Sequence, residues 1–160
     1  MIHINIICVG KIKEAFFKDS INEYSKRLNK YCSLSITELQ DEKIPNNPSE
    51  KEIIIIKDKE GQNILNNIKK DSYIICMDLK GKQFTSEEFS TKIEDISLNK
   101  SSTITFIIGG SLGISENVLK FSNELISFSK MTFPHQLFRV ILLEQIYRAF
   151  KIINNETYHK

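Results

Sequence analysis

The chain has 160 residues, of which 41% are hydrophobic and 26% charged, and its formal net charge at pH 7 is only +2. This length and composition predict a single globular domain over residues 1–160, and they exclude a disordered chain and a protein coated in positive charge. No apolar run approaches the ~20 residues that span a bilayer. The start, MIHINIICVG, lacks the basic region of a signal peptide. We therefore expect a cytoplasmic protein without a membrane segment.

In chain order, short apolar runs alternate with longer amphipathic stretches. The predicted elements are a strand at 4–9, a helix at 14–28, a strand at 34–39, a loop at 41–50, a helix to about 68, a strand at 73–78 ending in the turn LKGK, a helix at 85–98, a strand at 103–108, a helix at 115–123, a strand at 125–128 and a helix from 134 to 153. This alternation predicts an α/β domain with a mainly parallel sheet and helices on both faces.

Local signals support several of these boundaries. Ser49 with Glu52, and Thr85 with Glu88, have the capping-box spacing that begins a helix. The run IIII at 53–56 would suit a strand by propensity, but its long, charged and periodic surroundings favour a helix.

Cysteine and histidine usage gives no sign of a metal site. Of three cysteines without CxxC spacing, Cys8 and Cys76 fall in predicted strands, where a free thiol behaves as a small hydrophobe. The histidines His3, His135 and His159 form no cluster with metal-ligand spacing. We expect no bound metal.

Charge is distributed unevenly along the chain. Residues 1–30 and residues 120–160 each carry six Lys/Arg against three Asp/Glu, so the middle is acidic. Basic ends fit a local contact with a polyanion better than general coating of nucleic acid. Ordinary solvated charge explains the same pattern.

The most informative stretch is IIGGSLG (107–113), followed by SKMTFPHQ (129–136). Each comes directly after a predicted strand, and adjacent loops at the carboxyl ends of strands form the ligand crevice of open α/β sheets. The three glycines allow sharp turns or close approach of backbone to a ligand. This pairing predicts a nucleotide-like cofactor held by backbone. The loop matches neither GxGxxG nor GxxxxGK[ST], so a plain strand-to-helix turn is an equal alternative.

The last predicted helix is apolar around nearly its whole circumference between residues 137 and 153. Such a helix must be covered on both sides. The sheet covers one side, and a second subunit is the simplest cover for the other, which predicts a homodimer. Glu144 and Arg148 have the spacing of an ordinary helix ion pair.

Several of these stretches together resemble one family. IIGGSLG, SFSKMTFPHQLFRVILLEQIYRAFKI and the closing YHK are similar to the RlmH family of small SPOUT-class methyltransferases. CVGKIKEAFFKDSINEYSKRL and DEKIPNNPSEKEI…KEGQNIL resemble the same family, so the likeness covers essentially the full chain. Met77 departs mildly, because relatives often have leucine there, and the two side chains have similar volume.

The resemblance implies a fold and an activity that residue patterns do not. The fold would be the SPOUT-type α/β fold, with its C-terminal segment threaded as a trefoil knot. The enzyme would use S-adenosyl-L-methionine to methylate ring nitrogen 3 of a pseudouridine in the 23S rRNA of the bacterial large ribosomal subunit. It would act as a homodimer, with free rRNA, a 50S particle or a 70S ribosome as substrate.

The resemblance also assigns site residues. The cofactor-binding positions would be Met77, Gly109, Phe128, Ser129, Lys130, Met131, Thr132 and Phe133. Without the family, Phe128 and Met131 would be interpreted as core. Gly109 would be glycine to avoid collision with the cofactor.

On the substrate side, the catalytic candidates are His159, Arg139 and His135. His135 lies at a predicted helix start, where the dipole favours a neutral imidazole able to accept a proton. His159 lies in the terminal YHK, where Tyr158 and Lys160 suit base stacking and phosphate contact, although a chain end is often simply disordered.

Two other functions compete with this one. A SPOUT methyltransferase acting on tRNA would share the cofactor loops and differ only in its substrate. A non-catalytic RNA-binding module would use the glycine loop only as a turn. Binding of S-adenosylmethionine would argue against the second.

Overall fold

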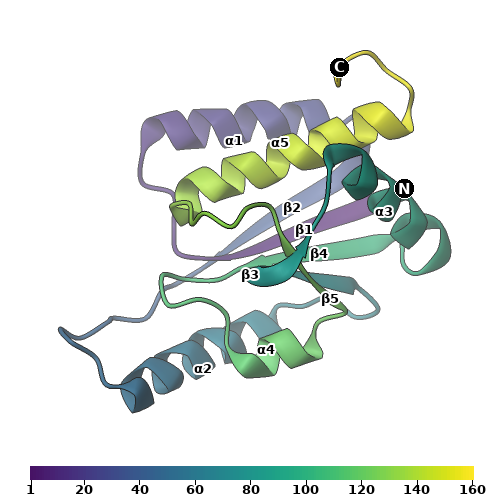
Figure 1. The fold of residues 1–160 in the computed structure, drawn as a ribbon. Coiled ribbons are helices and arrows are strands. Elements are labelled where there is room, and N and C mark those ends of the chain that lie inside the picture. The colour runs from purple at the N-terminus through teal and green to yellow at the C-terminus, as the bar shows by residue number, and fades with distance from the viewer.

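Five parallel strands form one sheet in the order β2-β1-β4-β3-β5 (Figure 1). The computed structural model describes residues 1–160. The strands are β1 (Ile2–Val9), β2 (Cys32–Leu39), β3 (Tyr73–Gln83), β4 (Thr103–Ile108) and β5 (Glu124–Ser127). The helices are α1 (Ala15–Leu28), α2 (Glu50–Asn66), α3 (Ser86–Asn99), α4 (Glu116–Phe121) and α5 (His135–Ile153). The predicted α/β class, with a parallel sheet, is confirmed.

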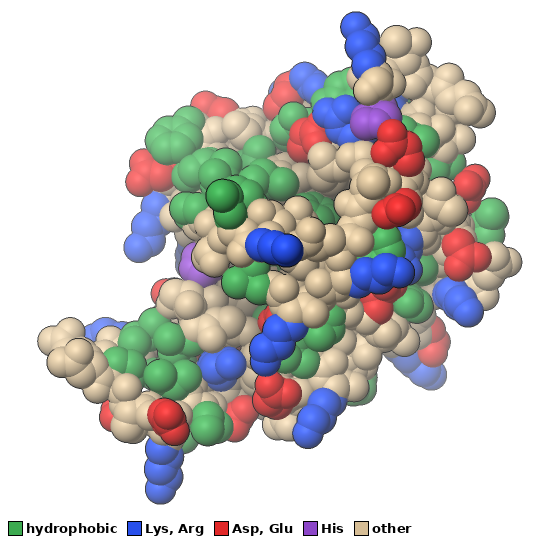
Figure 2. Space-filling view, in the orientation of Figure 1, with side chains coloured by type: hydrophobic (Ala, Val, Ile, Leu, Met, Phe, Trp, Pro, Cys, Tyr) green, Lys and Arg blue, Asp and Glu red, His purple; other side chains and the backbone are tan.

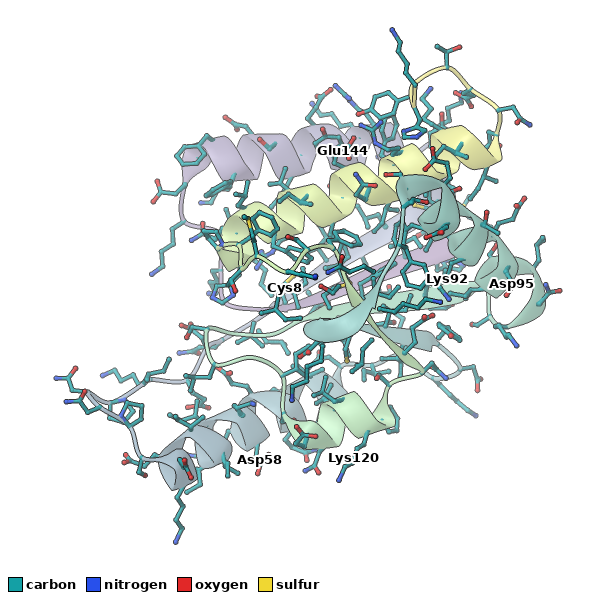
Figure 3. The ribbon with its side chains drawn as sticks, viewed as in Figure 1. Cys8, Asp58, Lys92, Asp95, Lys120 and Glu144 are labelled. Carbon is teal, nitrogen blue, oxygen red and sulfur yellow. The ribbon has the colours of Figure 1, made fainter.

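Helices cover both faces of the sheet, as the sequence predicts. α1, α3 and α5 lie on one face, and α2 and α4 on the other (Figure 1). Two separate hydrophobic clusters fill these layers, one around Phe106 and Leu142 and the other around Ile107 and Val118. Figure 3 shows this order through labelled residues, with Glu144 in one helix layer, Asp58 and Lys120 in the other, and Cys8 between them. None of the helices has the length and apolar character needed to cross a membrane.

Capping boxes mark where α2 and α3 begin. Ser49 accepts a hydrogen bond from the Glu52 N–H, and the Glu52 carboxylate accepts one from the Ser49 N–H, so the first predicted capping box is confirmed. Thr85 and Glu88 form the second in the same way. The IIII run lies in α2, as its periodic context predicts. The capping box directly before it stabilises a helix start, which outweighs the β propensity of four isoleucines.

The strand β3 is longer than predicted. The LKGK segment, predicted as a turn, continues the strand to Gln83, and a bulge lets both Met77 and Lys82 pair with Ile126. At Gly81 an added Cβ would lie 2.5 Å from the Ile126 carbonyl carbon, so only glycine allows β3 to cross β5 this closely. The prediction failed because this pairing depends on a strand more than forty residues later in the sequence. The C-terminal trefoil knot stays a prediction.

The cover of α5 also differs from the prediction. α1 and α3 flank this helix on the sheet, so Leu142, Leu143 and Ile146 are fully buried within one chain. No second subunit is needed to cover them. The outward stripe of α5 carries Leu137 and Ile141 in its first half and Glu144 and Arg148 in its second, all half-buried.

Candidate functional site

The main cavity lies where the carboxyl ends of β3, β4 and β5 meet. It has a volume of about 490 Å³ and is lined by residues 77–80 of β3, where its pairing with β4 ends, and by the glycine loop, the β5–α5 loop and the start of α5. The predicted residues that line it are Met77, Gly109, Phe128, Ser129, Met131, Thr132, Phe133 and His135. Lys130 is exposed and lies outside the lining. The structure thus gathers seven of the eight predicted cofactor positions around one cavity, and their roles remain predictions.

The glycine loop is a tight turn that holds itself together. The Gly113 N–H donates to the Gly110 carbonyl at 3.0 Å, and Gly113 has a φ of +91°, in the region that favours glycine. A Cβ on Gly109 would lie 2.7 Å from Ile114 Cγ1 and 2.9 Å from the Gly113 carbonyl carbon. Gly109 is therefore required by the loop's own packing. The expectation that glycine here also leaves room for the cofactor stays a prediction.

The β5–α5 loop is shaped by a serine pair and an aromatic cluster. Ser127 Oγ donates to the Ser129 carbonyl at 2.8 Å, and Ser129 Oγ accepts from the Met131 N–H at 2.9 Å. Phe128 packs edge-on against Phe89, with ring centroids 5.5 Å apart. Phe128 therefore belongs both to the core and to the cavity wall, so the two interpretations of this residue were not exclusive. By contrast, Met131 is 74% exposed and is not a core residue.

His135 is the first residue of α5 and a half-buried part of the cavity wall. No side chain caps this helix start, because Pro134 occupies the N-cap position. The helix-terminal N–H groups beside His135 are therefore available to a ligand or to water. Of the three catalytic candidates, only His135 lines the cavity of its own chain.

Arg139 points away from this cavity. Its side chain is 2% exposed, and its guanidinium donates to Glu38 at 2.5 Å and to the Gly10 carbonyl at 3.1 Å. Burial would raise the pKa of Glu38, but hydrogen bonds from the Ile12 N–H and from Arg139 hold it below its usual value. Arg139 thus ties α5 to the loop after β1 and to β2. It also borders a second cavity of about 340 Å³ between α1 and β2.

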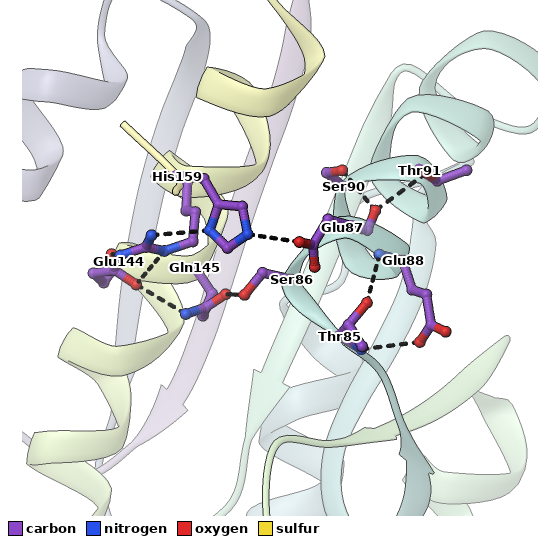
Figure 4. A network of polar contacts seen from close by, with 10 residues as sticks. Thr85, Ser86, Glu87, Glu88, Ser90, Thr91, Glu144, Gln145 and His159 are labelled. Atoms are coloured by element: carbon purple, nitrogen blue, oxygen red, sulfur yellow. Dashed lines mark hydrogen bonds and ion pairs between the residues drawn. The ribbon is translucent and has the colours of Figure 1, made fainter. Parts of the chain in front are cut away.

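His159 lies at the opposite end of α5 from the cavity. Arg148 Nη1 lies 3.1 Å from His159 Nδ1, and His159 Nε2 lies 2.7 Å from Glu87 Oε1 (Figure 4). These contacts fit the tautomer in which Nδ1 accepts and Nε2–H donates. The bond from His159 lowers the pKa of Glu87.

Tyr158 and Glu156 hold the rest of the tail. Tyr158 donates to Glu144 at 3.0 Å and packs against Tyr147, with ring centroids 5.0 Å apart. Glu156 accepts from Lys30, Tyr31 and Lys151. The tail is therefore docked on its own chain rather than frayed.

One wall of the cavity is made of residues that were not predicted to lie in the site. Asp78, Leu79 and Lys80 at the β3 bend, and Lys57 from α2, also line it. The rule that ligands bind at the carboxyl ends of strands applies equally to β3 and would have found the first three. Lys57 has no such signal, since only tertiary packing brings α2 there. No group of three or more His, Cys, Asp or Glu side chains is placed to hold a metal ion.

Comparison with known proteins agrees with this geometry. A family profile described as "Predicted SPOUT methyltransferase" matches residues 2–159. The chain is 64% identical over 158 residues to the ribosomal RNA large subunit methyltransferase H of Clostridium botulinum strain Langeland, and 60% identical to the protein of that name from Clostridium acetobutylicum. Each alignment covers 99% of both chains. The chain therefore belongs to the SPOUT methyltransferases, in the RlmH family.

Proposed function

We propose that this protein transfers the methyl group of S-adenosyl-L-methionine to ring nitrogen 3 of a pseudouridine in the 23S rRNA of the large ribosomal subunit. The observation that carries the proposal is the cavity at the ends of β3, β4 and β5, because seven of the eight expected cofactor positions line it. The names of the relatives support ribosomal RNA as the substrate class. Because ribosomes are cytoplasmic, this substrate supports a cytoplasmic location.

The residues present fit this cofactor. A cavity of about 490 Å³ suits a ligand of this size, and such sites combine apolar walls with a few polar groups. Met77, Phe128 and Phe133 would hold the adenine, while the backbone of the glycine loop and of the β5–α5 loop would hydrogen-bond the polar parts. When bound, the cofactor supplies an electrophilic methyl group on a sulfonium, so the protein mainly has to orient donor and acceptor.

On the substrate side, the acceptor nitrogen must lose a proton. His135 is the candidate general base within the chain, since it lines the cavity at the start of α5. Arg139 is bound to Glu38 and Gly10, so we assign it a positioning role: it anchors the helix that carries His135.

We further propose a homodimer in which the tail of one chain serves the cavity of the other. The nineteen residues of α5 span about 28 Å, so His159 and His135 lie at opposite ends of the helix. Within one chain the tail is too far from the cavity to act there. Figure 2 shows hydrophobic side chains gathered over the starts of α1 and α5, and Phe16 of α1 is 62% exposed. This surface, with Leu137 and Ile141, is our candidate dimer interface.

The decisive experiment incubates the purified protein and labelled S-adenosylmethionine with ribosomes from a strain lacking the enzyme, followed by mapping of the methyl group. Parallel samples contain free 23S rRNA, 50S particles, 70S ribosomes and total tRNA. We expect label at one pseudouridine of 23S rRNA. Label in tRNA alone would favour the tRNA-modifying alternative, and absence of both cofactor binding and label would favour the non-catalytic RNA-binding module.

A further inference from the structure

A buried carboxylate lies behind the glycine loop. Glu60 of α2 is only 5% exposed, although a glutamate side chain in water is charged at neutral pH. Burial raises its pKa, the hydrogen bond from the Glu42 N–H lowers it, and the charges of Asp41 and Glu42 raise it further, so that the net shift is upward. Burial of a carboxylate beside two like charges costs stability. Its presence here therefore needs a reason other than packing.

The contacts of Glu60 join three segments that are distant in sequence. Its Oε2 accepts a hydrogen bond from the Glu42 N–H at 3.0 Å, in the loop after β2. On the other side the carboxylate faces Gly110. A Cβ on this glycine would lie 3.0 Å from Oε1 and 3.2 Å from Oε2 of Glu60. The carboxylate thus fills the space directly beside the Gly110 backbone.

The next residue of α2 supports the other end of the same segment. A Cβ on Gly61 would overlap Ser115 Oγ, the atom that caps α4 by accepting from the Val118 N–H. Two consecutive residues of α2 therefore contact the start and the end of the loop between β4 and α4. Glu60 itself is not part of the cavity lining, and its most direct contact with the lining is Gly110.

We infer that Glu60 is a positioning residue that holds the Gly109–Gly113 loop in its ligand-binding shape by bridging Gly110 to the loop after β2. This inference rests on the proposed function for its ligand, S-adenosylmethionine. It assigns a role to the DEK and KEG segments, residues 41–43 and 59–61, which the cavity itself does not explain.

The test compares Glu60→Gln, which keeps the shape and one acceptor oxygen, with Glu60→Ala, which removes both. Titration calorimetry with S-adenosylmethionine should give wild-type affinity for Glu60→Gln. For Glu60→Ala we expect about tenfold weaker binding, the effect of one lost hydrogen bond to a charged group. Glu42→Gln is the matched control, because Glu42 contributes its backbone N–H rather than its side chain, and it should bind normally.

A double-mutant cycle tests the contact with Gly110 directly. Gly110→Ala should weaken binding, since its new Cβ presses on the carboxylate. Glu60→Ala makes room for this Cβ. The double variant should therefore lose less affinity for S-adenosylmethionine than the product of the fold-losses of the two single variants. Amide hydrogen exchange at residues 110–113, without ligand, should be faster in Glu60→Ala and unchanged in Glu60→Gln.

Wild-type affinity and exchange in a folded Glu60→Ala protein would overturn the inference, as would independent effects in the cycle. If Glu60→Ala does not fold, the exchange rates of the other two variants decide. Faster exchange of residues 110–113 in Gly110→Ala, with wild-type exchange in Glu60→Gln, supports the inference. Unchanged exchange in Gly110→Ala overturns it. If the wild type does not bind S-adenosylmethionine, the proposed function fails, and the ligand-free exchange measurements still decide the role of Glu60.

Discussion

The two halves of α5 face different surroundings and are built from different chemistry. The first half borders the open cavity and presents Leu137 and Ile141 on its outward stripe. The second half presents Glu144 and Arg148, which bind each other, and Arg148 also contacts His159 of the tail (Figure 4). Glu144 accepts a further hydrogen bond from the Tyr158 hydroxyl. Glu144 and Arg148 are thus more than the ordinary helix ion pair that their spacing indicates.

This contrast separates two tasks along one helix. Apolar side chains and free backbone groups at the cavity end suit a nucleotide-like ligand, which needs a dry wall and a few hydrogen bonds. Charged groups at the tail end hold a short segment that has little apolar surface of its own to bury. Burial of Tyr158, together with its hydrogen bond to Glu144, raises the pKa of its hydroxyl to about 12, so this contact persists through the physiological range.

The largest expected effect is at the cavity end. Gly109→Val should abolish S-adenosylmethionine binding, because its side chain would overlap Ile114 and Gly113 and displace the loop. Overpacking of this kind should also lower the free energy of unfolding by about 1–3 kcal/mol. Calorimetry and thermal melting measure both. The control is Ser102→Val, because Ser102 is exposed and directly precedes β4, at the end of the strand away from the glycine loop. Normal affinity in a folded Gly109→Val protein would mean that the loop is only a turn.

At the tail end, deletion of residues 158–160 should lower methyl transfer by at least ~10²-fold, as expected for loss of a positioned acid–base group. Cofactor affinity should change little, because the cavity lies at the other end of α5. Single-turnover methylation of ribosomes and cofactor titration of the truncated protein provide the measurement. Wild-type turnover would leave His135 as the remaining candidate base.

The outward stripe gives a test of the dimer. Ile141→Glu should dissociate the proposed homodimer while leaving the fold intact, since the side chain is only half-buried in one chain. Ile146→Glu should instead unfold the protein, because Ile146 is fully buried within its own chain and the new charge would have no partner. Analytical ultracentrifugation distinguishes the two. A wild-type protein that sediments as a monomer at micromolar concentration would contradict the dimer.

Arg139 provides a smaller effect. Arg139→Met should lower the free energy of unfolding by about 2 kcal/mol, less than for a fully buried pair because Glu38 is partly exposed. Denaturant unfolding measures this loss. The control is Lys18→Met, because Lys18 and Arg139 both line the second cavity, between α1 and β2. If the variant is as stable as wild type but inactive, Arg139 acts on the substrate rather than as an anchor.

The smallest effect is the pH dependence of the tail. Hydrogen bonds from Lys151 and Tyr31 lower the pKa of Glu156 from 4.5 to about 2. Because the folded pKa is depressed, the stabilising contact is complete above pH 4.5 and is lost as the pH falls from there towards 2. The protection factors of the tail amides, measured against the intrinsic exchange rate at each pH, should therefore fall over this window, and Glu156→Gln should remove the dependence. A flat profile in the wild type would show that Glu156 does not anchor the tail.

The sequence alone determined most of the secondary structure and one half of the site. Capping boxes and apolar periodicity are local, so Ser49, Thr85 and the strand 103–108 were predicted closely. The glycine loop and the segment after β5 were predicted to form one crevice because strand ends and glycines are also visible locally, and both segments line the same cavity.

Tertiary structure decided the rest. β3 continues through LKGK because β5 pairs with it, and Arg139 is an anchor because Glu38, 101 residues away, accepts its hydrogen bond. Gly109 is constrained by its packing against Ile114 and Gly113, and Glu60 lies behind the loop only because α2 packs there. These features depend on contacts between distant segments, and the periodicity and spacing of a single sequence carry no information about which distant residue will be the partner.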